Sequence, residues 1–384
     1  MKDISIFFQP VYLEEKYSQD SLGDKLIVHT ENNFPELSNS GIALFHVPEY
    51  RNCEGKLKEN EDEKFRNHLY KLFVGANWKK NTYDLGNILP GETIADTYLA
   101  LSEVTKELVQ NNFIVIVVGG TQDLTVAQYR AYSKLEQLVN LASVDSKFDL
   151  GSEEEKIVPN GWLTSIVLEK PCFLFNYSNI SAQNHYIPPK EIELFEKLYF
   201  DSIRLGQLTN DLSLCEPILR NSDILSLDLT AIKASDFGGD YYTQPNGLSS
   251  NETCRIGRYA GISDKLSSIG IYNYFPQYTT DKGDQLVAQL IWYFIEGVEL
   301  RKGDFPVGTK KNYSKYHVFN EEVNSEILFY KSDKSSRWWM EVPYPAQKGI
   351  KYERHHLVPC TYYDYEEAMK GVLPDLWWKT FQKL

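Results

Sequence analysis

The feature that most limits the possible folds is an uninterrupted apolar run in the first half of the chain. Residues 113–118 (FIVIVV) are apolar and mostly β-branched, and Gly119 and Gly120 follow them directly. Such a run has no polar face, so it is typical of a parallel strand that is covered on both sides of a sheet. The chain is therefore expected to contain an α/β domain built around such strands.

Similar strand signals recur along the chain, with helical stretches between them. We expect further strands at 41–47, 139–144, 172–177, 202–205, 224–229 and 267–272, and helices at 189–198, 252–262 and 285–300. This alternation predicts a three-layer α/β/α domain with a mostly parallel central sheet. We expect the domain to span residues 41–300, after an N-terminal segment of residues 1–40.

The chain changes in character after residue 300. Residues 301–316 are rich in Lys, Gly and Pro, whereas 326–331 and 337–342 alternate like the strands of a hairpin. The apolar content of this part lies mostly in aromatic residues, including the pairs Trp338-Trp339 and Trp377-Trp378. Such side chains need a partner surface, and so short a segment has little core of its own. We expect 301–384 to be a C-terminal extension that packs on the main domain.

Charge and cysteine content argue against several functional classes. The net charge of −13 argues against nucleic-acid binding through a general basic surface. Residues 1–11 lack the long apolar core of a signal peptide or a membrane span. The five cysteines are scattered, without CxxC spacing, which is typical of reduced thiols in a cytoplasmic protein. We therefore expect a cytoplasmic protein that binds neither nucleic acid nor membrane.

Two aspartates follow the strand expected at 139–144, where a parallel sheet usually places its ligands. They belong to the segment 145–149 (DSKFD), and a histidine between them would complete a good site for a divalent metal ion. Lys147 stands there instead. Its ammonium group has three hydrogen-bond donors and no lone pair to give to a metal.

Four stretches of the chain resemble, in order and spacing, motifs of the arginase, agmatinase and formimidoylglutamase family, the ureohydrolases. The family patterns Gly-Gly-Asp-His-Ser, Asp-Ala-His-x-Asp, Ser-x-Asp-x-Asp and Pro-Gly-Gly-Leu-x-x-x-Glu are matched by 119–123 (GGTQD), 145–149 (DSKFD), 226–230 (SLDLT) and 245–252 (PNGLSSNE). The resemblance covers about residues 40–300. It implies the arginase-like fold and a homo-oligomer. It also implies a family chemistry in which two manganese ions hold a hydroxide that attacks a guanidinium or formimino carbon.

The resemblance assigns a role to each position of the motifs. It matches Asp145, Asp149 and Asp228 to carboxylate ligands, which should converge, and it matches Gln122 and Lys147 to the two histidines, Thr230 to the last aspartate and Asn273 to a later glutamate. Between residues 119 and 300 the only histidine is His185, which lies in a Gln-Asn-His-Tyr loop. An imidazole-containing two-metal site built from the usual strands is therefore excluded.

Two arrangements of the three carboxylates stay open. In one, Asp145, Asp149, Asp228 and the amide oxygen of Gln122 hold a single divalent ion, Mn²⁺, Mg²⁺ or Ca²⁺. In the other, which we prefer, the Lys147 ammonium is an internal counter-ion, placed on the side of Asp145 and Asp149 by strand alternation. Neither arrangement contains two manganese ions. The ordinary interpretation is that Asp145 and Asp228 cap helices or bind loop amides.

The sequence thus predicts an arginase-family protein that is impaired or silent in guanidinium and formimino hydrolysis. Such a protein would keep the fold for assembly or for binding a small amidine-like or amino-acid ligand. The alternative is an active amidine C–N hydrolase, similar to formimidoylglutamase or agmatinase, that uses one metal at Asp145, Asp149 and Asp228. The loops after the strands contain no residue that decides the substrate.

Overall fold

The computed structural model of the chain describes residues 2–12, 16–37, 40–53, 63–151, 157–306, 310–344 and 353–384. Within these ranges, none of the helices combines the length and the apolar character that crossing a membrane requires.

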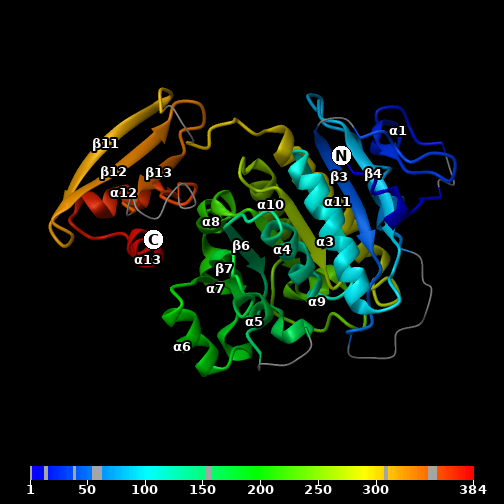
Figure 1. The fold of residues 1–384 in the computed structure, drawn as a ribbon, viewed down its shortest axis with the longest axis horizontal. Coiled ribbons are helices and arrows are strands. Elements are labelled where there is room, and N and C mark those ends of the chain that lie inside the picture. Colours follow the sequence, from blue (N-terminus) through cyan, green and yellow to red (C-terminus); the bar gives the residue numbers. More distant parts are fainter. Residues whose placement is uncertain are drawn as a thin grey trace.

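A ten-stranded sheet forms the centre of the main domain (Figure 1). Its strands lie in the order β1-β4-β3-β5-β10-β9-β6-β7-β8, and β2 also pairs with β4. The strand bounds are β1 Phe8–Gln9, β2 Ile27–Val28, β3 Gly41–Val47, β4 Thr82–Ile88, β5 Phe113–Gly119, β6 Val139–Val144, β7 Leu174–Ala182, β8 Asp201–Arg204, β9 Ile224–Asp228 and β10 Ser268–Tyr272. The pairing of β1 with β4 is antiparallel, and the other pairings are parallel. The predicted α/β class with a mostly parallel sheet is confirmed.

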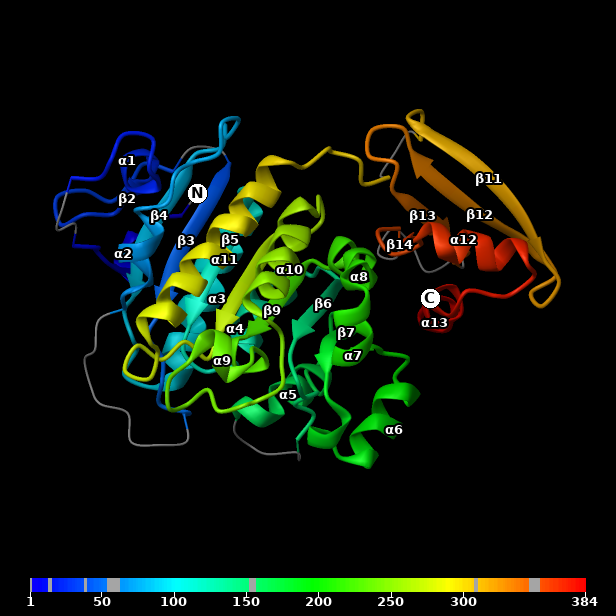
Figure 2. The same cartoon turned by 180° about the vertical axis from the view of Figure 1, so that it is seen from behind.

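Helices cover both faces of this sheet (Figures 1 and 2). Their bounds are α1 Leu22–Lys25, α2 Phe65–Leu69, α3 Ile94–Gln110, α4 Leu124–Ser133, α5 Trp162–Val167, α6 Pro189–Lys197, α7 Leu205–Asn210, α8 Cys215–Asn221, α9 Ala234–Phe237, α10 Ser250–Ile262 and α11 Asp281–Glu299. In β5, Val115 and Val117 pack in the core under α3, whereas Ile114 and Ile116 pack in the core under α10 and α11. Successive residues of a strand point to opposite faces, which explains why this strand is apolar throughout.

A second sheet, antiparallel and four-stranded, follows α11 and lies beyond α8 (Figure 2). It consists of β11 Tyr313–Asn320, β12 Ser325–Ser332, β13 Trp338–Glu341 and β14 Leu357–Cys360, followed by α12 Tyr362–Met369 and α13 Asp375–Lys383. Arg220 of α8 donates hydrogen bonds to the backbone carbonyls of Trp338 at 2.9 Å and Cys360 at 3.1 Å. Arg354 pairs with Asp223, next to β9, at 3.0 Å. Buried polar contacts thus join the two sheets at α8 and β9.

Candidate functional site

Four neighbouring strands bring the predicted site residues to one edge of the main sheet. The strands β5, β10, β9 and β6 are adjacent, and Gln122, Asn273, Asp228 and Asp145 lie at or just after their carboxyl ends in that order. Asp228 pairs with Tyr272 across β9 and β10, and the residues just before Asp228 and Asp145 pair across β9 and β6. Since neighbouring strands lie about 4.8 Å apart, these side chains come from a strip of backbone only a few strands wide.

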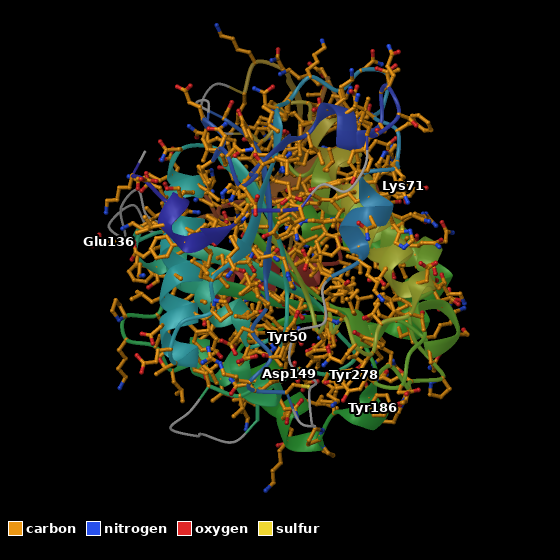
Figure 3. The ribbon with its side chains drawn as sticks, turned by 90° about the vertical axis from the view of Figure 1, so that its right-hand side faces the viewer. Tyr50, Lys71, Glu136, Asp149, Tyr186 and Tyr278 are labelled. Carbon is orange, nitrogen blue, oxygen red and sulfur yellow. The ribbon has the colours of Figure 1, made fainter. Side chains whose placement is uncertain are left out.

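A cavity of about 190 Å³ lies at this edge of the sheet. It is lined by the seven positions that the sequence singled out, Gln122, Asp145, Lys147, Asp149, Asp228, Thr230 and Asn273, together with Pro159, Asn160, Tyr241, Thr243 and Gln244. Figure 3 shows Asp149 at the same end of the molecule as Tyr50 and Tyr278, and away from Lys71. The candidate residues therefore share a single cavity.

Asp228 receives hydrogen bonds from two of the substituted positions. Its Oδ1 accepts from the Thr230 backbone N–H at 2.7 Å and from Asn273 Nδ2 at 2.8 Å, and its Oδ2 accepts from the Thr230 hydroxyl at 2.6 Å. Burial raises the pKa of Asp228 above its usual value, while these hydrogen bonds lower it in part. Thr230 and Asn273 thus supply donors where a metal ion would supply positive charge.

Asp145 is the least exposed acid of the cluster, at 2%, against 6% for Asp149 and 5% for Asp228. Its Oδ1 accepts from the Lys147 backbone N–H at 2.9 Å, and its Oδ2 has no hydrogen-bond partner within the described part of the chain. Burial raises the pKa of Asp145 well above its usual value, and the nearby charges of Asp149 and Asp228 raise it further. Two carboxylates have no proton between them, so Asp145 can donate to Asp149 only in its protonated form.

Asp149 combines a raised pKa with an unusual backbone conformation. Burial raises its pKa to about 7, although a hydrogen bond from the Asp145 carboxyl acts in the opposite direction. The indole of Trp162 donates to Asp149 Oδ2 at 3.0 Å. The backbone φ of Asp149, 52°, lies in the left-handed region, which Asp tolerates better than most residues. This conformation turns the chain beside the cavity.

Lys147 lines the cavity without a direct ion pair. Its charge lowers the pKa of Asp149 and of Asp228, but less than the other influences on these groups. Within the described residues, no carboxylate oxygen lies within 4.0 Å of its ammonium nitrogen. The strand β6 ends at Val144, so strand alternation does not orient Lys147; its carbonyl accepts instead from the Asn179 side chain at 2.6 Å. The role of Lys147 as a counter-ion stays a prediction, and its charge would act on the aspartates over a longer distance than in a direct ion pair.

The remaining candidate ligands do not gather around one point. Gln122 is buried, and its Nε2 donates to the hydroxyls of Ser143 at 3.4 Å and Ser226 at 3.3 Å. His185 lines a different hollow. Across the residues that the structure describes, no group of three or more His, Cys, Asp or Glu side chains is placed to hold a metal ion. The three aspartates share one cavity.

The sequence did not reveal the residues that complete the cavity, namely Pro159, Asn160, Tyr241, Thr243 and Gln244. The first two lie in the short 3-10 helix Pro159–Gly161 and the others in a connecting segment, so neither strand nor α-helix periodicity gives a signal. One signal was present for Tyr241, Thr243 and Gln244, because Gly238 and Gly239 come shortly before them in the chain and have φ values of 79° and 101°. A Cβ at Gly239 would lie 1.8 Å from the Tyr278 carbonyl oxygen, so this turn requires glycine.

Comparison with known proteins identifies relatives of this fold. A model of the arginase family matches residues 59–296, which is more than half of the chain. Formiminoglutamase from Trypanosoma cruzi with Mn²⁺ aligns with a TM-score of 0.64 and 15% identity, over 73% of this chain and 99% of that chain.

Two further solved structures align over similar lengths. Formimidoylglutamase from Bacillus subtilis gives a TM-score of 0.64 and 14% identity, over 77% of this chain and 97% of that chain. Agmatine ureohydrolase from Thermoplasma volcanium gives a TM-score of 0.54 and 18% identity, over 74% of this chain and 95% of that chain. No curated protein matches the chain. At these identities the structural likeness establishes the fold, and the family model adds the membership.

Proposed function

The chain belongs to the arginase family, and from this premise we propose that it is impaired or silent in guanidinium and formimino hydrolysis and that its cavity binds a small ligand. The family reaction depends on a hydroxide that metal ions activate. The observation that carries the proposal is the hydrogen bonding of Asp228, which accepts from Thr230 and Asn273. This carboxylate is satisfied by protein donors at the place where a metal ion would be needed.

The side chains around the cavity do not suit a pair of manganese ions. Two of the positions that would supply ligands, Thr230 and Asn273, direct donors at Asp228 instead. A third position, Lys147, carries a positive charge on the same cavity wall. At about 6 Å and an effective dielectric of about 20, an ammonium and a divalent ion repel by about 5.5 kcal/mol. We therefore derive no reaction step through a metal pair.

The alternative function is an active amidine C–N hydrolase with one metal ion. One observation favours it, because the free Oδ2 of Asp145 faces no donor and Asp149 lies beside it. Both oxygens suit a hard divalent ion such as Mg²⁺, Ca²⁺ or Mn²⁺. Such an ion would supply a Lewis acid or an activated water, and these two aspartates would hold it.

Metal analysis after manganese loading separates these functions. We expect at most one ion per chain and no hydrolysis of arginine, agmatine or formiminoglutamate at ordinary enzymatic rates. The triple variant Lys147→His, Gln122→His and Thr230→Asp should gain metal ions. A variant with Lys190→His, on the exposed surface of α6, is the matched control and should gain none. Two ions per wild-type chain together with substrate hydrolysis would refute the proposal.

A further inference from the structure

The outermost strand of the C-terminal sheet has a free edge. Within the described residues β11 pairs with β12 alone, and it lies on the side of that sheet away from the main domain (Figure 2). Its eight residues, Tyr313–Asn320, keep one continuous register with β12 and contain neither proline nor glycine. A long and regular edge strand is a template for a further strand, because its outward N–H and carbonyl groups are available for pairing.

The register shows which backbone groups of β11 point to the free edge. The pairing of Tyr313 with Ser332 places Asn312 directly opposite Asp333, and the Asp333 N–H donates to the Asn312 carbonyl at 2.9 Å. Hydrogen-bonded and non-hydrogen-bonded pairs alternate in an antiparallel ladder, so the even-numbered residues of β11 bond to β12. The residues whose N–H and carbonyl groups point to the free edge are therefore Tyr313, Lys315, His317 and Phe319.

The side chains of β11 are complementary to a second copy of the same strand. When two copies run antiparallel about Tyr316, Lys311 of one copy lies opposite Glu321 of the other, and both residues are exposed. Phe319, which is 59% exposed, then lies opposite the ring of Tyr313. Cross-strand pairs of opposite charges and of aromatic rings stabilise an antiparallel ladder. In this register odd-numbered residues lie opposite one another, so their outward backbone groups form its hydrogen bonds.

The charges near the centre of the strand are compatible with this register. Lys315 of one copy lies opposite His317 of the other, and the His317 Nδ1 is 2.9 Å from the Glu326 carboxylate. Glu326 pairs with Phe319 in the neighbouring strand, so its side chain is on the same face of the sheet as Lys315 and His317. A carboxylate next to His317 therefore offsets the ammonium group of the second copy.

The opposite edge of the C-terminal sheet is not open in the same way. β14 is the other outer strand, and it lies against α8 of the main domain. Arg220 of α8 donates to the Cys360 carbonyl of β14 at 3.1 Å. Pairing through β11 therefore ends when two copies have joined, which gives a closed twofold arrangement.

We propose that β11 is a dimerisation strand. Two copies of the chain pair antiparallel along residues 313–320, with the twofold axis at Tyr316, and their four-stranded sheets join into one continuous sheet. This surface lies outside the residues that the arginase-family model matches, which end at 296. The pairing is also independent of what the cavity of the main domain binds, because β11 belongs to the other sheet.

A proline at an outward position tests the pairing. His317→Pro removes an N–H that points to the free edge and keeps the bonds to β12, since proline is accommodated on edge strands whose N–H faces solvent. His317→Ala keeps this N–H and is the matched control. By size-exclusion chromatography with light scattering at one concentration, wild type and His317→Ala should have twice the mass of His317→Pro. Thermal midpoints close to the wild-type value show that both variants are folded.

A disulfide at the twofold axis tests the register. Tyr316 lies opposite its own copy in a non-hydrogen-bonded pair, where Cα atoms are about 4.5 Å apart, within the span of a disulfide. Tyr316→Cys should therefore crosslink two chains under oxidising conditions. Ser314→Cys is the matched control on the same face of the strand, because its own copy lies about 13 Å further along and cannot be bridged. Both variants contain the same five native cysteines, so their background crosslinking is equal.

Two results would overturn the proposal. One is a wild-type mass equal to that of folded His317→Pro, which would show that the free edge of β11 joins no chains. The other is crosslinking of Tyr316→Cys that does not exceed that of Ser314→Cys, which would show that no twofold axis lies at Tyr316. If His317→Pro does not fold, the comparison of the two cysteine variants decides alone.

Discussion

Removal of the Thr230 hydroxyl should destabilise the protein in a pH-dependent way. The hydroxyl donates to Asp228 Oδ2 at 2.6 Å, and Asp228 is only 5% exposed. A hydrogen bond to a charged group contributes about 1.5–3 kcal/mol, and Thr230→Val should lose that amount at pH 8. Thr230→Ser keeps the hydroxyl and should lose much less.

The pH dependence follows from the protonation of Asp228. Burial already raises its pKa in the folded state above the value of the unfolded chain. The folded state then binds more protons than the unfolded state between the two pKa values, so stability falls as pH rises through that window. Loss of a donor to the carboxylate raises the folded pKa further. The difference between wild type and Thr230→Val should therefore be small near pH 4 and largest at pH 8.

Urea unfolding of the chelator-treated protein at several pH values measures this difference. The slope of free energy against denaturant should be the same for both proteins, so that the midpoints report stability. A destabilisation that is equal at pH 4 and pH 8 would show that the hydroxyl does not stabilise an ionised Asp228.

Three further predictions concern other parts of the molecule. Burial lowers the pKa of His46 to about 4, so the free energy of unfolding should fall by about 3 kcal/mol as pH falls from 6.5 to 4. Urea unfolding should show a weaker dependence of stability on pH in His46→Gln. Arg220→Met removes the side-chain donor from one carbonyl of β13 and one of β14. Amide hydrogen exchange in these strands should become faster, because each buried carbonyl that loses its donor costs about 1–3 kcal/mol of stability. Gly239→Ala should lower the thermal midpoint far more than Gly371→Ala, because both have positive φ but only Gly239 would place its Cβ against Tyr278; equal shifts would contradict this.

The central strands could be predicted from sequence because their signal is local. The run at 113–118 and the run at 139–144 are β5 and β6 almost to the residue, since burial on both faces leaves an apolar pattern in the chain itself. The strand β4 was missed, because Asp84 interrupts its pattern. That carboxylate is fully buried and accepts from Arg66 Nε and Tyr70 OH, each at 2.8 Å. Its partners lie in another element, which no local pattern reveals.

The sequence predicted which residues line the cavity, but it did not predict the hydrogen bonds among them. The positions lining the cavity follow from strand ends, because parallel strands end at one edge of a sheet. The donors on Asp228 come from Asn273, 45 residues away along the chain, and from a turn that the sequence did not specify. Lys147 was assigned an orientation from strand alternation, although β6 has already ended before it. Such details depend on loop conformation, which periodicity does not encode.

The arrangement of the site across four adjacent strands has a consequence for folding. Two of these strands, β5 and β6, come from residues 113–144, and the other two, β9 and β10, come from residues 224–272 and lie side by side between them. Pairings between segments so distant in the chain form slowly, because a long loop must close before any contact is gained. The cavity therefore comes into existence only when the second pair of strands has inserted, and a partly folded state without these strands cannot contain it. A ligand of the cavity would bind the completed fold alone, and its concentration would set how much of the chain population is held there.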